Sequence, residues 1–196
     1  LKNGDNITAS YNSIAGTNSP VGSYAISASL NDPEGRLPNY SLSVVEGMLL
    51  MTPAPLLGQG DNTSRLYGQP NPLFTVTYSG FVNGEDPSVL EGMFIGTTPA
   101  LLDSPAGTYP IQGAGQSALN YSVSYLDGIL AITENELIVT ADNATRIYGE
   151  DNPLLTGTLT GLQPGDNITV TYSTSATVPS AVGTYAIVPV LNDPEG

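Results

Sequence analysis

The chain has 196 residues, of which 18 are acidic and four are basic, and it contains neither histidine nor cysteine, so its formal net charge is −14. A surface this acidic repels phosphate backbones, and we expect no nucleic-acid partner. The missing residue types exclude disulfides, thiolate metal sites, cysteine nucleophiles and catalytic triads with a histidine base. Glycine and proline are abundant, which is typical of a β-rich secreted module, and no apolar run approaches membrane-spanning length.

Two internal repeats organise the sequence. The phrase Arg-x-Tyr-Gly-x-x-Asn-Pro occurs at 65–72 and again at 146–153, 81 residues later. Residues 1–35 match residues 162–196 without a gap, at an offset of 161 residues. Such periods are the signature of tandem arrays of small domains, here with two alternating domain types. We call the resulting parts the first segment (1–53, the C-terminal part of a repeat domain), the central segment (54–134, a complete repeat domain) and the third segment (135–196, the N-terminal part of the next repeat domain).

The first segment has the alternation of strands with one buried face. Apolar residues alternate with polar ones over 7–11 and again over 24–28, as they do in half-buried strands. From 40 to 51, two apolar runs flank Glu46-Gly47. A two-residue loop of this type predicts a β-hairpin whose two arms share one apolar face.

The central segment repeats this pattern. Tyrosine and valine alternate with serine over 121–125, and Asp127-Gly128 follows; the pair predicts a second hairpin, with Tyr125 opposite Leu130. Asp86 stands before Pro87, which favours a single helical turn with an aspartate N-cap. The residues 56–60 predict a first strand that is short or weak.

The third segment begins with an alternating strand over 137–141. A second strand ends at Tyr148-Gly149, and a third spans 155–159. The linkers at 52–55 and 133–136 are short, and the former carries two prolines. Because such linkers are stiff, we expect the array to be a semi-rigid rod.

The fold class expected from these patterns is mainly β, built from small two-layer domains that are Ig-like or β-grasp-like, with at most a short helical turn per repeat. Tyr-Gly-x-x-Asn-Pro is followed by Gly-Asp or Gly-Glu, Gly-Ser/Thr-Tyr-x-Ile and Asn-Tyr-Ser. This order of motifs resembles the MBG domain of the Tyr-Gly-x type. The resemblance implies a tandem array in a large bacterial surface protein or adhesin, with a role as a stalk.

Enzyme function is not expected. A lysine base is limited to Lys2, and no glycine-rich phosphate loop is present. The acidic residues stand beside glycine, asparagine and proline, where turn formation and solvation explain them. Lys–Asn isopeptide bonds within each domain are not expected either, because each bond needs its own lysine and the chain has only one.

Calcium is the metal that the sequence favours, because Asp-Asn and Asn-Asp pairs supply oxygen ligands. No cofactor is otherwise expected. Asx turns use the same residues, and the spacing of an EF-hand loop is absent. The candidate calcium ligands are Asp61, Asp142, Asp151 and Asp166.

Six sequons offer candidate glycosylation sites. A chain rich in Ser, Thr and Asn produces several such triplets by chance. The candidate asparagines are Asn6, Asn39, Asn62, Asn120, Asn143 and Asn167.

Three functions fit these observations. The first is a stalk or fibre of an extracellular cell-surface protein, whose partners are neighbouring repeats of the same chain or fibre. The second is an adhesive module for host or surface glycans, with Tyr67 and Tyr148 as stacking platforms. The third is a linker array stiffened by calcium. In all three, Arg65 and Arg146 hold an acidic turn or stack on a tyrosine, and the array continues past residue 196 into another Asn-Tyr-Ser strand.

Overall fold

The computed structural model describes residues 1–2 and 4–194. The chain forms two compact units. The first unit comprises 1–61, 74–97 and 111–128, and the second comprises the rest of the described chain. The structure is mainly β, as the sequence predicts, with two 3-10 turns, η1 (Leu37–Asn39) and η2 (Pro87–Val89). No helix in the described residues is long and apolar enough to cross a membrane.

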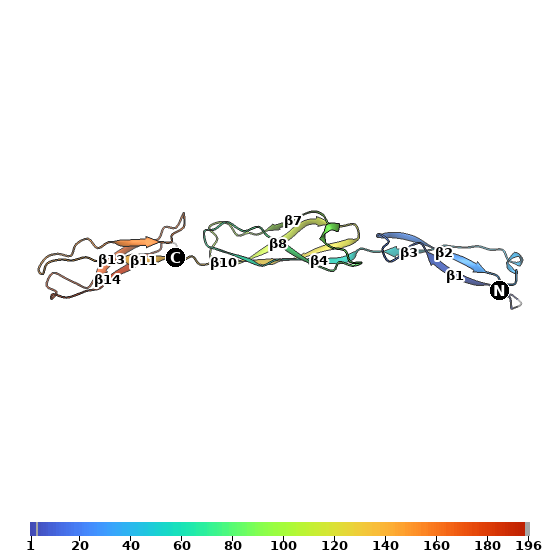
Figure 1. Cartoon of the computed structure of the whole chain (residues 1–196), viewed down its shortest axis with the longest axis horizontal. Coiled ribbons are helices and arrows are strands. Elements are labelled where there is room, and N and C mark those ends of the chain that lie inside the picture. Colours follow the sequence, from blue (N-terminus) through green and yellow to red (C-terminus); the bar gives the residue numbers. More distant parts are fainter. Residues whose placement is uncertain (3, 195–196) are drawn as a thin grey trace. The chain divides into compact units, whose positions relative to one another are not determined.

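The first unit contains two three-stranded sheets (Figure 1). One is antiparallel, in the order β1-β2-β3, and its strands are β1 (Thr8–Ser13), β2 (Gly22–Asn31) and β3 (Gly47–Met51). The other has the order β6-β4-β9, and its strands are β4 (Ala54–Gly60), β6 (Val76–Ser79) and β9 (Tyr121–Leu126). Strand β4 pairs parallel with β9 and antiparallel with β6. The prediction of a short or weak first strand is therefore wrong: β4 has seven residues and lies at the centre of its sheet.

A four-stranded sheet has the order β5-β10-β8-β7. Its strands are β5 (Thr63–Leu66), β7 (Glu91–Thr97), β8 (Gly107–Ser117) and β10 (Gly128–Thr133). Strand β10 pairs parallel with β5, and β7 pairs antiparallel with β8. The second unit also holds two antiparallel strand pairs, which are β11 (Ile138–Ala141) with β12 (Gly157–Thr160) and β13 (Thr169–Thr174) with β14 (Ile187–Asn192).

The hairpins expected at Glu46-Gly47 and Asp127-Gly128 do not form. Strand β3 pairs with β2 instead, and residues 41–46 contain no strand. Strands β9 and β10 belong to different sheets. Neither glycine has the positive φ that a tight hairpin turn needs. Gly128 serves a different purpose, because a Cβ on it would lie 2.6 Å from the carbonyl oxygen of Gly60.

Two paired stretches of the central segment pass together from one sheet into another, first as β4 with β9 and then as β5 with β10. Ala54 of β4 is opposite Tyr121 of β9, and Thr63 of β5 is opposite Leu130 of β10, so the same offset of 67 residues holds in both parallel pairings. The stretches 54–66 and 121–133 therefore keep one register through the crossing. The close approach of Gly60 and Gly128 lies at this crossing.

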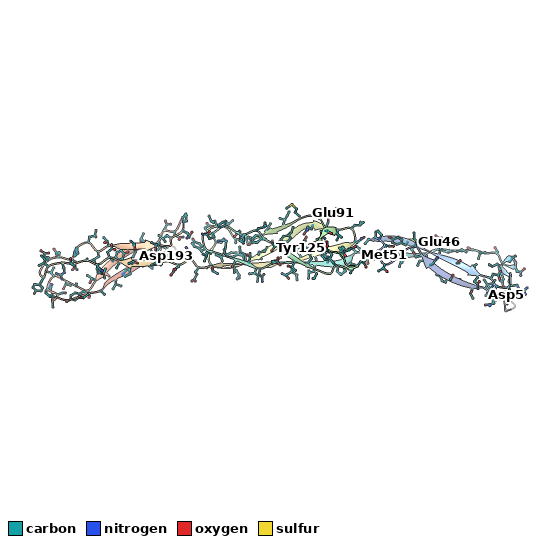
Figure 2. All side chains as sticks on the ribbon, viewed as in Figure 1. Asp5, Glu46, Met51, Glu91, Tyr125 and Asp193 are labelled. Atoms are coloured by element: carbon teal, nitrogen blue, oxygen red, sulfur yellow. The ribbon has the colours of Figure 1, made fainter. Side chains whose placement is uncertain are left out.

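The inward faces of these strands were predicted correctly although their partners were not. Tyr121 is 5% exposed and Ser122 and Ser124 are exposed, as the alternation predicts. Tyr125 lies among the strands of the central segment (Figure 2), and its ring lies in a slot that has no side chain at Gly58 of β4 and at Gly113 of β8. A Cβ on either glycine would lie 2.8 Å from the ring. The two layers of the core thus meet at Tyr125.

The helical turn expected after Asp86 is present as η2, and the Asp86 side chain accepts a hydrogen bond from Ser88 N at 2.8 Å. Several apolar residues of the first segment have no cover. Leu42, Val44 and Leu49 are exposed, whereas Met51 at the end of β3 is half-buried.

Candidate functional site

The arginine of the repeated phrase ties the end of the central segment together. Arg65 on β5 is 7% exposed, and its Nε donates to Asn71 Oδ1 at 2.7 Å. Its two Nη atoms donate to the carbonyl oxygens of Leu66 and Leu101. Asn71 in turn donates to the carbonyl oxygen of Ala100 at 2.8 Å. These bonds satisfy the buried guanidinium group of Arg65, since burial of a charged group without partners is costly.

The second copy of the phrase makes the same kind of contacts. Arg146 donates to the carbonyl oxygens of Glu150 and Thr177, and Asn152 donates to that of Ala176 at 2.7 Å. Both arginines therefore bind neutral carbonyl oxygens. Arg146 holds the turn that ends at Glu150, as the sequence predicts, but through the backbone carbonyl of Glu150 and not through its carboxylate. For Arg65 the expectation of an acidic turn or a tyrosine is wrong, because its acceptors belong to Leu66, Asn71 and Leu101. The phrase is a structural cross-link from a strand end to a distant loop.

The glycines of the phrase adopt the conformation that the Tyr-Gly pair suggests. Gly68 has φ +78° and Gly149 has φ +89°. A residue with a side chain rarely adopts this region of φ. Glycine is thus needed to turn the chain after Tyr67 and Tyr148.

Acidic side chains at one repeated loop position each accept a tyrosine hydroxyl. Asp5, Glu85 and Asp166 each directly follow a glycine, namely Gly4, Gly84 and Gly165. Their partners are Tyr40, Tyr121 and Tyr67, with oxygen–oxygen distances of 2.6, 2.5 and 2.8 Å. The hydrogen bond to Asp5 raises the pKa of Tyr40, while burial and then the bond to Glu85 raise the pKa of Tyr121. These contacts are short charge-assisted hydrogen bonds.

Sequence reasoning missed these tyrosine–acid pairs. The signal was present, because Asn39-Tyr40 and Asn120-Tyr121 follow Gly4-Asp5 and Gly84-Glu85 at nearly equal distances, with 35 residues from Asp5 to Tyr40 and 36 from Glu85 to Tyr121. It went unused because turn chemistry alone accounts for an acid beside a glycine.

Asn120 joins the first and central segments. Its side-chain oxygen accepts from Val21 N at 3.0 Å, and its backbone oxygen accepts from Ala54 N at 2.9 Å. Only Thr52 and Pro53 lie between β3 and β4. Residues 134–137 are the corresponding link between β10 and β11. Both links are as short as the sequence predicts.

The structure separates the candidate calcium ligands. Among the described residues, no group of three acidic side chains is placed to hold one metal ion. Both carboxylate oxygens of Asp61 accept threonine hydroxyls, from Thr75 at 2.6 Å and from Thr77 at 2.8 Å. Asp142 Oδ2 accepts from Thr156 at 2.8 Å, Asp166 is the tyrosine partner described above, and Asp151 is exposed. A calcium-stiffened linker stays a prediction.

The pKa of Asp61 predicts a local acid sensitivity. The hydrogen bonds from Thr75 and Thr77 lower its pKa below the ordinary value of 3.8. A lowered folded-state pKa contributes stability that is fully present well above pH 3.8 and is lost as the pH falls through the folded pKa. We expect Asp61→Asn to be less stable than the wild type at pH 6 and to lose less stability on acidification from pH 6 to pH 3.

Urea denaturation at the two pH values measures this difference. The exposed Asp103 supplies a matched control, and Asp103→Asn should follow the wild type. An acid response of Asp61→Asn equal to that of the wild type would contradict the linkage.

The sequon asparagines occupy different settings. Asn120 is half-buried, and the other five are exposed. The side-chain oxygen of Asn62 accepts from Ile129 N at 2.8 Å, so Asn62 as well as Asn120 has a structural role. Glycosylation of any of the six stays a prediction.

Comparison with known families is consistent with this geometry. The family model described as MBG domain (YGX type) matches residues 1–50, 59–131 and 137–193. No curated protein and no solved structure gives a significant match to the chain. The tandem match covers most of the chain and includes both copies of the Tyr-Gly phrase. The chain therefore belongs to the MBG domain (YGX type) family.

Proposed function

We propose that the chain is a structural, non-enzymatic repeat module that forms part of the stalk or fibre of an extracellular bacterial adhesin or filament. One observation carries the proposal: the same arginine and asparagine contacts recur in two copies of the phrase, and both end on backbone carbonyls. Side chains that bond backbone carbonyls of their own domain stabilise the fold, and their polar groups are then not available to bind a ligand. The partners of each repeat are then its neighbours in the chain.

The short links and the family support this role. Two residues separate β3 from β4, and four separate β10 from β11. Links of this length leave little freedom between consecutive domains. The match to the MBG family supports a repeat module of a surface protein, and it supports an extracellular location in the same way. The absence of cysteine is compatible with it.

The length of a repeat array tests the proposal. Because residues 162–196 repeat residues 1–35, copies of 1–161 joined end to end keep the natural order of motifs at each joint. For chains with one, two and four copies, we expect the maximum dimension from small-angle scattering to grow in proportion to copy number. Growth near the square root of copy number is the behaviour of a flexible string, and it would overturn the stalk proposal.

Glycan binding is the second candidate, favoured by one observation. The side chain of Tyr148 is 64% exposed, whereas Tyr67 is half-buried and bonded to Asp166. An exposed aromatic ring can stack on a sugar face. A glycan array probed with the whole chain distinguishes the candidates, since binding that Tyr148→Ala abolishes would favour adhesion over a purely structural role.

A further inference from the structure

The Tyr-Gly turn of the central segment stands where the chain leaves that segment. Tyr67 and Gly68 are the central residues of a turn after β5, which a backbone hydrogen bond of 3.2 Å between the flanking residues closes. Gly68 has φ +78°. Tyr67 N donates to the carbonyl oxygen of Thr133, the last residue of β10, at 2.8 Å. The turn is therefore fixed beside the link 134–137.

A loop of the third segment contacts this turn. The hydroxyl of Tyr67 donates to Asp166 Oδ1 at 2.8 Å, and a Cβ on Gly68 would lie 2.5 Å from Cγ of Gln163. The loop is itself closed, because Gln163 N donates to Asp166 Oδ2 at 2.8 Å and Asp166 N donates to the carbonyl oxygen of Gln163 at 3.1 Å. All four residues belong to the second unit. The tyrosine and the glycine of the phrase thus each have a partner on the next domain.

The equivalent loop of the central segment lies at the other domain junction. Residues 82–85 correspond to 163–166 in the Gly-x-x-Gly-acid motif, and the same backbone hydrogen bond from last to first residue closes them, at 3.0 Å. Together with Val21 and Met51 of the first segment, this loop lines a cavity of about 120 Å³ within the first unit. At both junctions, the loop therefore faces the domain that precedes it.

The acid of the loop has an oxygen for each of two tyrosines. In the first segment, Asp5 accepts the hydroxyl of Tyr40, from the same domain, at Oδ2. Asp166 accepts the hydroxyl of Tyr67, from the preceding domain, at Oδ1. Because a carboxylate accepts hydrogen bonds at both oxygens, a bond to the preceding domain is compatible with the bond inside the domain.

We propose that the repeated phrase is the docking site for the next repeat domain. Its arginine and asparagine hold their own domain, whereas its tyrosine donates to the acid of the next domain and its glycine leaves room for the side chain three positions before that acid. In this chain, Tyr67 and Gly68 dock Asp166 and Gln163. Because the contact lies beside the link, it resists rotation of one domain about the link. The inference rests on neighbouring repeats being partners, as proposed above, but array length depends on the links, so the two proposals can fail separately.

A disulfide between the turn and the loop tests the docking. Cβ of Gln163 is one bond from its Cγ, so a Cβ on Gly68 would lie within disulfide range of it. The chain has no cysteine of its own. In the full chain with Gly68→Cys and Gln163→Cys, we expect mild oxidation to give an intramolecular disulfide. Adding Tyr67→Phe should lower the equilibrium constant of the disulfide in a glutathione buffer by about fivefold, because the hydroxyl no longer holds Asp166.

The matched control is Gly149→Cys with Gln163→Cys. Gly149 has φ +89° in the second copy of the turn, so a cysteine there meets the same backbone constraint. Among the described residues, no atom outside its chain neighbours lies within 4 Å of a Cβ placed on Gly149. The control pair should keep its free thiols, and Tyr148→Phe should leave the disulfide of the 68 and 163 pair unchanged.

Two further measurements complete the test. The first uses the chain extended after residue 196 by a second copy of residues 36–53, which then follow 162–196 as they follow 1–35, and the 68 and 163 pair should form the same disulfide. The second uses the unsubstituted chain, in which a nuclear Overhauser effect should join the α protons of Gly68 to the γ protons of Gln163. Equal disulfide formation at 68 and 149, its loss in the extended chain, no effect of Tyr67→Phe, or a missing Overhauser effect would each overturn the proposal.

Discussion

Replacing Tyr125 with alanine is expected to lower the free energy of unfolding of the central segment by about 3–5 kcal/mol, as large aromatic truncations in cores do. The ring occupies the slot left by Gly58 and Gly113, and its centroid lies 5.9 Å from that of Phe94. The two glycines have no side chains that could move into the cavity left by the ring. The cavity therefore persists in the variant, and most of the stability of a domain of this size is lost.

The neighbouring Ser124→Ala is the control for this prediction. Ser124 is exposed on the opposite face of β9, and its hydroxyl lies 3.5 Å from the carbonyl oxygen of Leu56. Its loss should cost under about 1 kcal/mol. Urea denaturation of the two variants measures both effects. Similar losses from both would mean that β9 presents the other face to the core.

Arg65→Ala is expected to cost about 3 kcal/mol or more, because a side chain that is 7% exposed loses three hydrogen bonds from a charged group, and such bonds contribute about 1.5–3 kcal/mol each. The acceptors are Asn71 Oδ1 and the carbonyl oxygens of Leu66 and Leu101. Arg65→Lys keeps the charge but loses the planar fork that reaches three acceptors, so we expect it to recover only part of the loss.

Thermal and urea unfolding measure the Arg65 series. The control is Arg36→Ala, since the Arg36 side chain is 52% exposed and its closest carboxylate contacts are 3.6 Å to Glu34 and 4.0 Å to Asp5. Exposed pairs of this kind contribute under about 1 kcal/mol. If Arg65→Ala is no more damaging than Arg36→Ala, the cross-link does not stabilise the end of the domain.

Residue alternation predicted the faces of the strands but not their partners. Tyr121 and Leu130 are inward as expected, since a period of two follows from strand geometry alone. Asp127-Gly128 is a local hairpin signal, yet partner choice here depends on a distant residue, Gly60, whose backbone meets Gly128 at the crossing. No pattern within a few residues of Asp127 contains that information.

The sequence identified the residues of the candidate site, but it did not identify the groups that they bind. The repeated phrase marked Arg65 and Gly68 as special, and the structure gives both a defined role. One carbonyl partner of Arg65 is that of Leu101, which lies on a loop without a recognisable sequence motif. Acceptors that are backbone atoms leave no trace in side-chain identity, so sequence reasoning assigned the arginine to acids and aromatic rings.

The common register of 54–66 and 121–133 has a mechanical consequence. The stretch that begins the central segment and the stretch that ends it run parallel, paired from Ala54 opposite Tyr121 to Leu66 opposite Thr133. A tension applied through the chain drags the first stretch backward and the last one forward, along their common direction. The ladder bonds between them are then loaded in shear, all at once, and cannot be peeled open one at a time. A tether made of such repeats resists stretching through its backbone pairing and needs no covalent staple.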